Sequence, residues 1–253
     1  MELLIVREIG SAAFAPGEYV EQQSFMGATE IRELAGRAAI GPGASVLDLC
    51  CGVAGPGRFI TLQLGCDYLG VDASAAAIEI ASARAGDLPC RFQVGRVPPL
   101  PAGRFDVVLL LETMLAFRDK AGLVAAASAA LGPGGRFAFT LEEGTPLTAQ
   151  ERAAMPNADT VWPAPLDEMV GLLEAAGLHV TWRDDLTAAH GATAAALAAA
   201  YAANGPAIAA QIGREGLDDL LASHRLWSDW LASGRVRKLA FVAQAGPGPE
   251  RQA

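Results

Sequence analysis

The feature that most constrains the fold is the alternation of short apolar runs with helical segments from residue 45 onward. The run FDVVLLLE at 105–112 is apolar at nearly every position, which is typical of a strand buried on both faces. Glycine and proline clusters such as GPGG at 132–135 separate these elements. Strands that alternate with helices predict a parallel sheet with helices on both faces. We expect seven strands, at 45–50, 67–72, 90–95, 105–112, 136–143, 178–186 and 236–244.

Helices are expected between these strands and before the first of them, where apolar residues at 18–40 follow helical spacing. Two later segments differ from the alternation. Residues 144–165 are polar and contain prolines, which predicts a lid loop. Residues 188–233 are rich in alanine and interrupted at 204–206, which predicts a helical cap. The whole chain, 1–253, is interpreted as one domain with its core at 40–186 and 235–245.

Composition narrows the classes of partner. The 253 residues carry a net charge of −9, without the overall basic surface that sequence-independent nucleic-acid binding requires. The basic cluster of Arg235, Arg237 and Lys238 is interpreted as a solvated strand end. No apolar run suits a membrane span, the first ten residues do not resemble a signal peptide, and the four cysteines match no zinc motif. We therefore expect a cytoplasmic monomer or homodimer that binds no nucleic acid, membrane or metal.

The stretch VLDLCCGVAGPGRF at 46–59 is a strand followed by a glycine-rich turn. Its glycines do not follow the G-x-G-x-x-G pattern of dinucleotide sites, and Pro56 lacks the backbone donor that a phosphate would use. Asp48 would repel a pyrophosphate but attract a cation. Asp72, at the end of the second strand, can accept both hydroxyls of a ribose. Together the two acids predict a cationic nucleoside, and S-adenosylmethionine fits that description.

The motifs VLDLCCGVAGPG, GVDAS, FDVVLLLE and LGPGGRFAFT, in this order, resemble the class I S-adenosylmethionine-dependent methyltransferases. The resemblance covers about residues 40–143 and is closest to the small-molecule branch that includes sarcosine/dimethylglycine and tocopherol methyltransferases. It implies a Rossmann-like α/β fold with a seven-stranded, mostly parallel sheet and an antiparallel last strand. It also implies methyl transfer to O, N or C of a small organic substrate, plausible in secondary metabolism.

The resemblance also implies a set of cofactor contacts. Cys50 and Ala54 replace glycines of the usual turn, and a Cβ at Cys50 is expected to be tolerated where φ is negative. Arg96 stands where the family usually has an aspartate that accepts from the adenine, and arginine cannot accept a hydrogen bond. The implied cofactor residues are Asp48, Cys50, Gly52 and Ala54 on the methionine side, Asp72 at the ribose, Ala73, Arg96 and Val97 at the adenine, and Leu111 and Glu112 on the far side.

Methyl transfer depends mainly on alignment, so a dedicated catalytic residue is optional. His224 and Glu142 are the candidates for a proton acceptor or substrate contact, whereas His179 is interpreted as structural. The candidates for an apolar substrate wall are Tyr19, Phe25, Met114, Leu115, Phe117, Trp162 and Trp227. Two alternatives stay open: a cyclase or isomerase that uses the cofactor without methyl transfer, and a non-catalytic cofactor-binding partner subunit.

Overall fold

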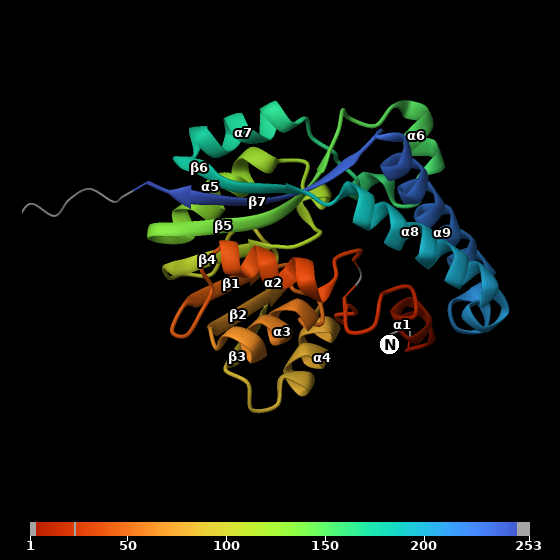
Figure 1. The fold of residues 1–253 in the computed structure, drawn as a ribbon, viewed down its shortest axis with the longest axis horizontal. Helices are drawn as coiled ribbons and strands as arrows, with labels where there is room; N and C mark the ends of the chain where they lie inside the picture. Colours follow the sequence, from red (N-terminus) through yellow and green to blue (C-terminus); the bar gives the residue numbers. More distant parts are fainter. Residues whose placement is uncertain (1–3, 23, 247–253) are drawn as a thin grey trace, which may run out of the picture.

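The structure is a computed structural model that describes residues 4–22 and 24–246. Its centre is a seven-stranded sheet in the order β3-β2-β1-β4-β5-β7-β6 (Figure 1). β7 runs antiparallel to both neighbours and the other adjacent strands are parallel, so the predicted fold is confirmed. The strands are β1 Ser45–Leu49, β2 Asp67–Asp72, β3 Cys90–Val94, β4 Phe105–Leu110, β5 Leu131–Glu143, β6 Leu178–Asp185 and β7 Arg237–Ala245.

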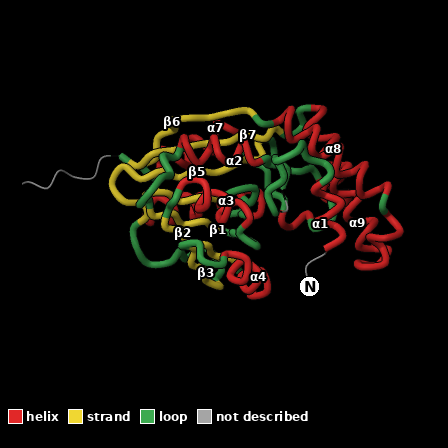
Figure 2. Tube along the Cα trace, turned by 60° about the horizontal axis from the view of Figure 1, so that its bottom comes forward, coloured by secondary structure: helices red, strands yellow, loops and turns green. Residues whose placement is uncertain are grey.

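Helices cover both faces of the sheet because its strands are apolar on both sides (Figures 1 and 2). Val46 of β1 packs with the helices of one face, and its neighbour Leu47 packs with those of the other. The first group contains α2 Ala28–Arg37, α3 Gly55–Leu64 and α4 Ala75–Ala85, and the second contains α5 Lys120–Ala130 and α7 Leu166–Ala175.

A helical cap extends from the carboxyl end of the sheet (Figure 1). It consists of α8 Thr187–Ala203 and α9 Gly205–Ser233, which are separated at Asn204 as the sequence predicted. α9 contains a kink at Gly213, where φ is 79°. α1 Leu4–Ser11 packs against the cap, with Ile9 beside Leu197 and Ile208. In the described part of the chain, no helix combines the length and apolarity needed to cross a bilayer.

The single helix predicted over 18–40 is wrong in its first half. α2 begins only at Ala28, because the Glu30 carboxylate accepts the Gly27 N–H at 2.9 Å and caps the helix there. Before it, Glu18 accepts hydrogen bonds from the backbone and hydroxyl of Thr29. Residues 12–22 and 24–27 form an irregular segment between α1 and α2, called the strap below, which borders the site.

The segment 144–165 is folded rather than an open loop. It contains α6 Ala149–Ala154, a short 3-10 turn at Ala158–Thr160, and a small apolar cluster in which Leu147 and Met155 pack with Trp230 of the cap. Arg235 reinforces it with an ion pair to Glu151 and bonds to nearby carbonyls. That the segment acts as a lid stays a prediction.

Candidate functional site

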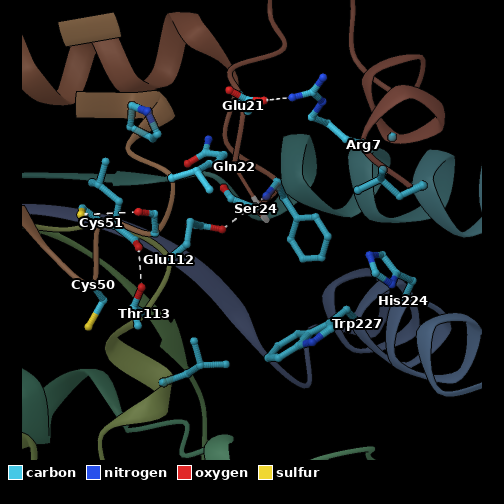
Figure 3. Close-up of a pocket in the computed structure, with 18 of the residues that line it drawn as sticks. Arg7, Glu21, Gln22, Ser24, Cys50, Cys51, Glu112, Thr113, His224 and Trp227 are labelled. Carbon is cyan, nitrogen blue, oxygen red and sulfur yellow. Dashed lines mark hydrogen bonds and ion pairs between the residues drawn. The ribbon is translucent and has the colours of Figure 1, made fainter. Parts of the chain in front are cut away.

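A cavity of about 810 Å³ lies between the carboxyl ends of the parallel strands, the strap and the cap (Figure 3). Asp48 and Asp72 line it from the ends of β1 and β2. Glu142 and Lys238 line it from β5 and β7. His224 faces it from the cap, on the side opposite Glu112 in Figure 3. The site thus lies at the sheet edge where open α/β sheets bind their ligands.

The turn after β1 is built from left-handed backbone. Cys50 has φ 58°, Gly52 has φ 55° and Ala54 has φ 55°. The negative φ under which a Cβ at Cys50 was expected to be tolerated is therefore not present, and two residues with side chains occupy conformations that favour glycine. Glu112, on the opposite wall, has φ 58° as well. Such strain costs about 1–3 kcal/mol at each residue and is concentrated at functional sites.

The three glycines of the turn have different tasks. A Cβ at Gly52 would meet nothing within 4 Å, so this glycine leaves the cavity open to a close-lying ligand. A Cβ at Gly55 would lie 1.8 Å from the backbone oxygen of Glu21, so Gly55 admits the strap. A Cβ at Gly57 would lie 2.1 Å from the Tyr68 ring. Two of the three glycines therefore serve packing of the protein against itself.

Asp48 is a buried acid whose carboxylate accepts a hydrogen bond from Tyr68. It is 3% exposed, and the Tyr68 hydroxyl donates to its Oδ2 at 2.5 Å. Burial raises the pKa of Asp48 to about 7; the Tyr68 hydrogen bond opposes this and the nearby Asp72 adds to it. A cation in the cavity would stabilise the charged form. Asp48 thus fits a cationic ligand better than an anionic one.

Asp72 is fixed in place by two backbone donors. Its Oδ2 accepts the Gly52 N–H at 2.9 Å, and its Oδ1 accepts the Ser74 N–H at 2.8 Å. Each carboxylate oxygen keeps further acceptor capacity for a ligand hydroxyl. Burial raises the pKa of the Cys50 thiol to about 12, so this residue is neutral at physiological pH. Two acids and a neutral thiol thus surround the open position at Gly52, and this combination fits a cationic nucleoside with free ribose hydroxyls.

A buried ion cluster forms another part of the wall. Lys238 is 3% exposed and its Nζ lies 2.7 Å from Oε1 of Glu112. The same ammonium contacts Oε1 of Glu142, which is 4% exposed. Burial alone would raise the pKa of Glu112, but Lys238 holds that pKa below its ordinary value. The interpretation of Lys238 as part of a solvated strand end is wrong, although Arg237 beside it is exposed and pairs with Glu143.

His224 contributes a neutral acceptor nitrogen. Its Nδ1 lies 2.8 Å from the Leu220 carbonyl, which can only accept, so Nδ1 carries the proton and Nε2 has the free lone pair. Burial lowers the pKa of His224 below 6.5. The rings of Phe25 and Tyr201 meet the imidazole edge to face at 6.2 and 5.0 Å, and Trp227 also lines this end. The cap end is thus an aromatic wall that includes the acceptor nitrogen of His224.

The cavity gathers many but not all of the predicted residues. Those that line it are Asp48, Cys50, Gly52, Asp72, Leu111, Glu112, Glu142, Tyr19, Phe25, Leu115, His224 and Trp227. Their roles in binding and catalysis stay predictions.

Several predicted substrate contacts lie elsewhere. Met114 is fully buried in the core, and Phe117 packs against the same core. Trp162 lies outside the lining, where its Nε1 donates to the Asp159 carbonyl and the Arg152 guanidinium stacks 4.1 Å from its ring centroid. The structure does not bring these three side chains to the cavity wall, because local packing already uses them, and their role in a substrate wall stays a prediction.

On the cofactor side, Ala54 is fully buried at the start of α3 and does not reach the cavity wall. Ala73 and Arg96 are exposed and Val97 packs on the core; none of the three lines the cavity. Ser74 and Ala77 line it near Asp72 instead. An adenine contact by Ala73, Arg96 or Val97 stays a prediction that would need ligand outside the enclosed volume.

Sequence reasoning missed Lys238, Tyr68, Tyr201 and the strap residues Gln22 and Ser24. For Lys238 there was a signal, because a lysine inside the apolar run VRKLAFVAQ must find a buried partner. Tyr68 in DYLGVD was a similar case, since a buried hydroxyl usually has a partner. The strap residues gave no pattern, because irregular segments are positioned by tertiary contacts.

The fold and site define a class: the class I methyltransferase fold. Residues 46–135 match the family model described as a methyltransferase domain. Phosphoethanolamine N-methyltransferase 3 of Arabidopsis thaliana is 32% identical over 103 residues, which are 39% of this chain and 21% of that protein. The Zea mays phosphoethanolamine N-methyltransferase 1 is 30% identical over 114 residues, 44% of this chain and 23% of the relative. The chain therefore spans about a fifth of the length of these curated relatives.

Solved structures extend the likeness to the rest of the chain. The cyclopropane synthase MmaA2 from Mycobacterium tuberculosis aligns with a TM-score of 0.78 and 15% identity over 96% of this chain and 98% of that one. The [4+2]-cyclase SpnF aligns at 0.76 and 16%, over 97% and 93%. Phosphoethanolamine N-methyltransferase 2 from Haemonchus contortus, in complex with S-adenosyl-L-methionine, aligns at 0.79 and 16%, over 97% and 57%.

These findings confirm the predicted resemblance to the class I S-adenosylmethionine-dependent methyltransferases. Residues 46–135 match the methyltransferase domain model, and the fold of the described chain is that of the class. At 14–19% identity the structural neighbours speak for the fold alone.

Proposed function

We propose that this chain is an S-adenosylmethionine-dependent methyltransferase that transfers a methyl group to O, N or C of a small organic molecule, in secondary metabolism. One observation carries the proposal. The ends of β1 and β2 present Asp48 and Asp72 on either side of the open, left-handed turn at Gly52. This arrangement suits a cationic nucleoside, and the family match over 46–135 supports the methyl donor in particular.

Asp72 would hold the ribose hydroxyls, and Asp48 with the Cys50–Gly52 turn would border the methionine part. When bound, S-adenosylmethionine supplies an electrophilic methyl group attached to a sulfonium. The chain itself would position the acceptor: Phe25, Leu115 and Trp227 line the cavity with apolar and aromatic surface. His224 Nε2 can accept a proton from an acceptor hydroxyl or amine that reaches it.

Glu142 is the weaker of the two predicted proton acceptors. Its Oε1 already contacts the Lys238 ammonium, so this oxygen is engaged within the protein. His224 keeps a neutral nitrogen for that role. We therefore assign proton acceptance to His224 and treat Glu142 as a binding group.

Calorimetric titration with S-adenosylmethionine and S-adenosylhomocysteine tests the cofactor proposal. We expect micromolar binding of both and a loss of at least about tenfold in Asp72→Ala, because the ribose hydroxyls would lose a charged acceptor. No binding at millimolar concentration would refute the proposal. Cofactor-dependent conversion of the acceptor without a methylated product would favour the cyclase or isomerase alternative, for which SpnF offers only a likeness of fold.

A further inference from the structure

We propose that Glu142 binds a cationic nitrogen of the substrate, so that the substrate of this enzyme is an amine carried on an apolar or aromatic skeleton. The inference deepens the proposed methyltransferase function and rests on it. It starts from one unsatisfied atom. Oε2 of Glu142 is buried and has no hydrogen-bond partner among the described residues. Glu142 itself is 4% exposed and lines the cavity.

A buried carboxylate oxygen without a donor is costly, more so than a neutral acceptor in the same position. Proteins usually satisfy such groups, and unsatisfied ones occur where a ligand completes the site. The other oxygen of Glu142 contacts Lys238, which keeps the side chain in place. Because Glu142 lines the cavity, a ligand bound there is the candidate for the missing donor.

The charge balance of the neighbourhood selects the kind of donor. Lys238 is shared between two carboxylates, those of Glu112 and Glu142, so the direct contacts leave one negative charge uncompensated. His190 pairs with a further acid, Glu30, at 3.1 Å, and it also interacts electrostatically with Glu112. Lys120 is close enough for its charge to act on Glu142, but its ammonium donates to the carbonyls of Phe117 and Trp162 and gives no hydrogen bond to Oε2 of Glu142.

A neutral hydroxyl could donate a hydrogen bond to Oε2 of Glu142, but it would add no positive charge opposite the carboxylate. A protonated amine supplies both donor and charge, and the interaction is strengthened by the low dielectric of a buried site. The adjoining wall determines the rest of the ligand. The Phe25 N–H donates to Oε2 of Glu112 at 3.4 Å, which ties the aromatic wall to the ion cluster. An amine on an apolar or aromatic skeleton therefore matches both the Glu142 carboxylate and the aromatic wall beside it.

The test uses the full-length protein saturated with S-adenosylhomocysteine and three probes of one shape: benzylamine, benzyl alcohol and benzoate. Near neutral pH the first is a cation, the second neutral and the third an anion. We expect benzylamine to bind at least about tenfold more tightly than benzyl alcohol, with benzoate weakest. In Glu142→Gln, which keeps the side-chain shape, that preference should disappear.

Glu143→Gln is the matched control, because Glu143 is the next residue, pairs with Arg237 and does not line the cavity. It should retain the preference for benzylamine. Equal binding of amine and alcohol, no binding of any probe, or an unchanged preference in Glu142→Gln would overturn the inference. So would an equal loss in both variants, which would indicate a general field effect. Binding of S-adenosylhomocysteine, measured separately, shows whether the proposed function fails as well, and thermal melting verifies that the variants fold.

Discussion

Tyr68→Phe tests the connection between the buried Asp48 and the proposed cationic ligand. The substitution removes one hydroxyl and leaves the ring that fills the space beside Gly57. The lost bond is a 2.5 Å hydrogen bond to a carboxylate, worth about 1.5–3 kcal/mol in its charged form. Since about 1.4 kcal/mol corresponds to one pKa unit, the pKa of Asp48 should rise by about one to two units above its value of about 7.

The measurement is the dissociation constant of S-adenosylmethionine between mildly acidic and alkaline pH. A cation favours ionised Asp48, so the wild-type affinity should be constant above the Asp48 pKa of about 7 and weaken as pH falls, at most about tenfold per unit. In Tyr68→Phe the midpoint should move up by about one to two units. Asp48→Asn should remove this dependence. The titration of the ligand's own groups is common to all proteins and cancels in the comparison.

Tyr201→Phe is the matched control, because it removes a hydroxyl at the cap end of the same cavity, near Gly10 rather than Asp48. Its midpoint should equal that of the wild type. An unmoved or lowered midpoint in Tyr68→Phe would refute the reasoning, as would an equal shift in Tyr201→Phe. Either result would show that Asp48 does not govern the binding.

Three further changes test other parts of the site. Lys238→Met should lower the free energy of unfolding by about 3–5 kcal/mol, because it leaves buried carboxylates unpaired. Arg237→Met, at the exposed neighbouring pair, should lower it by at most about 1 kcal/mol. Urea denaturation measures both, and equal losses would contradict the burial of the cluster. By the same method, Gly57→Ala should lower the free energy of unfolding by about 3 kcal/mol or more, because the new Cβ would meet the Tyr68 ring. Gly52→Ala should lose only about 1–2 kcal/mol from its left-handed φ and should chiefly weaken cofactor binding. The opposite order would contradict the assignment of Gly57 to packing and of Gly52 to the ligand. His224 should titrate below about 6.5 in an NMR pH series, because burial lowers its pKa. Its signal is identified by its loss in His224→Gln. A midpoint above about 6.5 would show that His224 does not present a neutral nitrogen at physiological pH.

The sequence was sufficient for the sheet because its signals are local. FDVVLLLE and the glycine stops determine strands and boundaries without knowledge of their neighbours, and the acids at Asp48 and Asp72 follow from strand ends. Part of the strap was predicted as helix because the apolar spacing continues through Phe25. The helix instead begins after the strap, at a cap that depends on one side chain, Glu30. Periodicity carries no information about such single contacts.

The differences between the predicted and the observed placement of site residues have a similar cause. Met114 and Trp162 have the residue types of a substrate wall, but residue type does not show whether packing has already used a side chain. Lys238 was misread because its two partners are 126 and 96 positions away in the chain, at Glu112 and Glu142. Pairings of that kind become visible only when the strands are placed side by side.

Gly57, Tyr68 and Asp48 form a chain of dependence with an evolutionary consequence. The ring of Tyr68 fits only because Gly57 lacks a Cβ, and the Tyr68 hydroxyl is the donor that keeps the Asp48 carboxylate competent to ionise. A substitution at any one position therefore changes what the other two tolerate. We expect the three positions to show epistasis: homologues with a smaller residue at 68 should accept alanine at 57 and carry a different group at 48. A glycine that resembles a cofactor motif would then be inherited because of a tyrosine on the neighbouring strand.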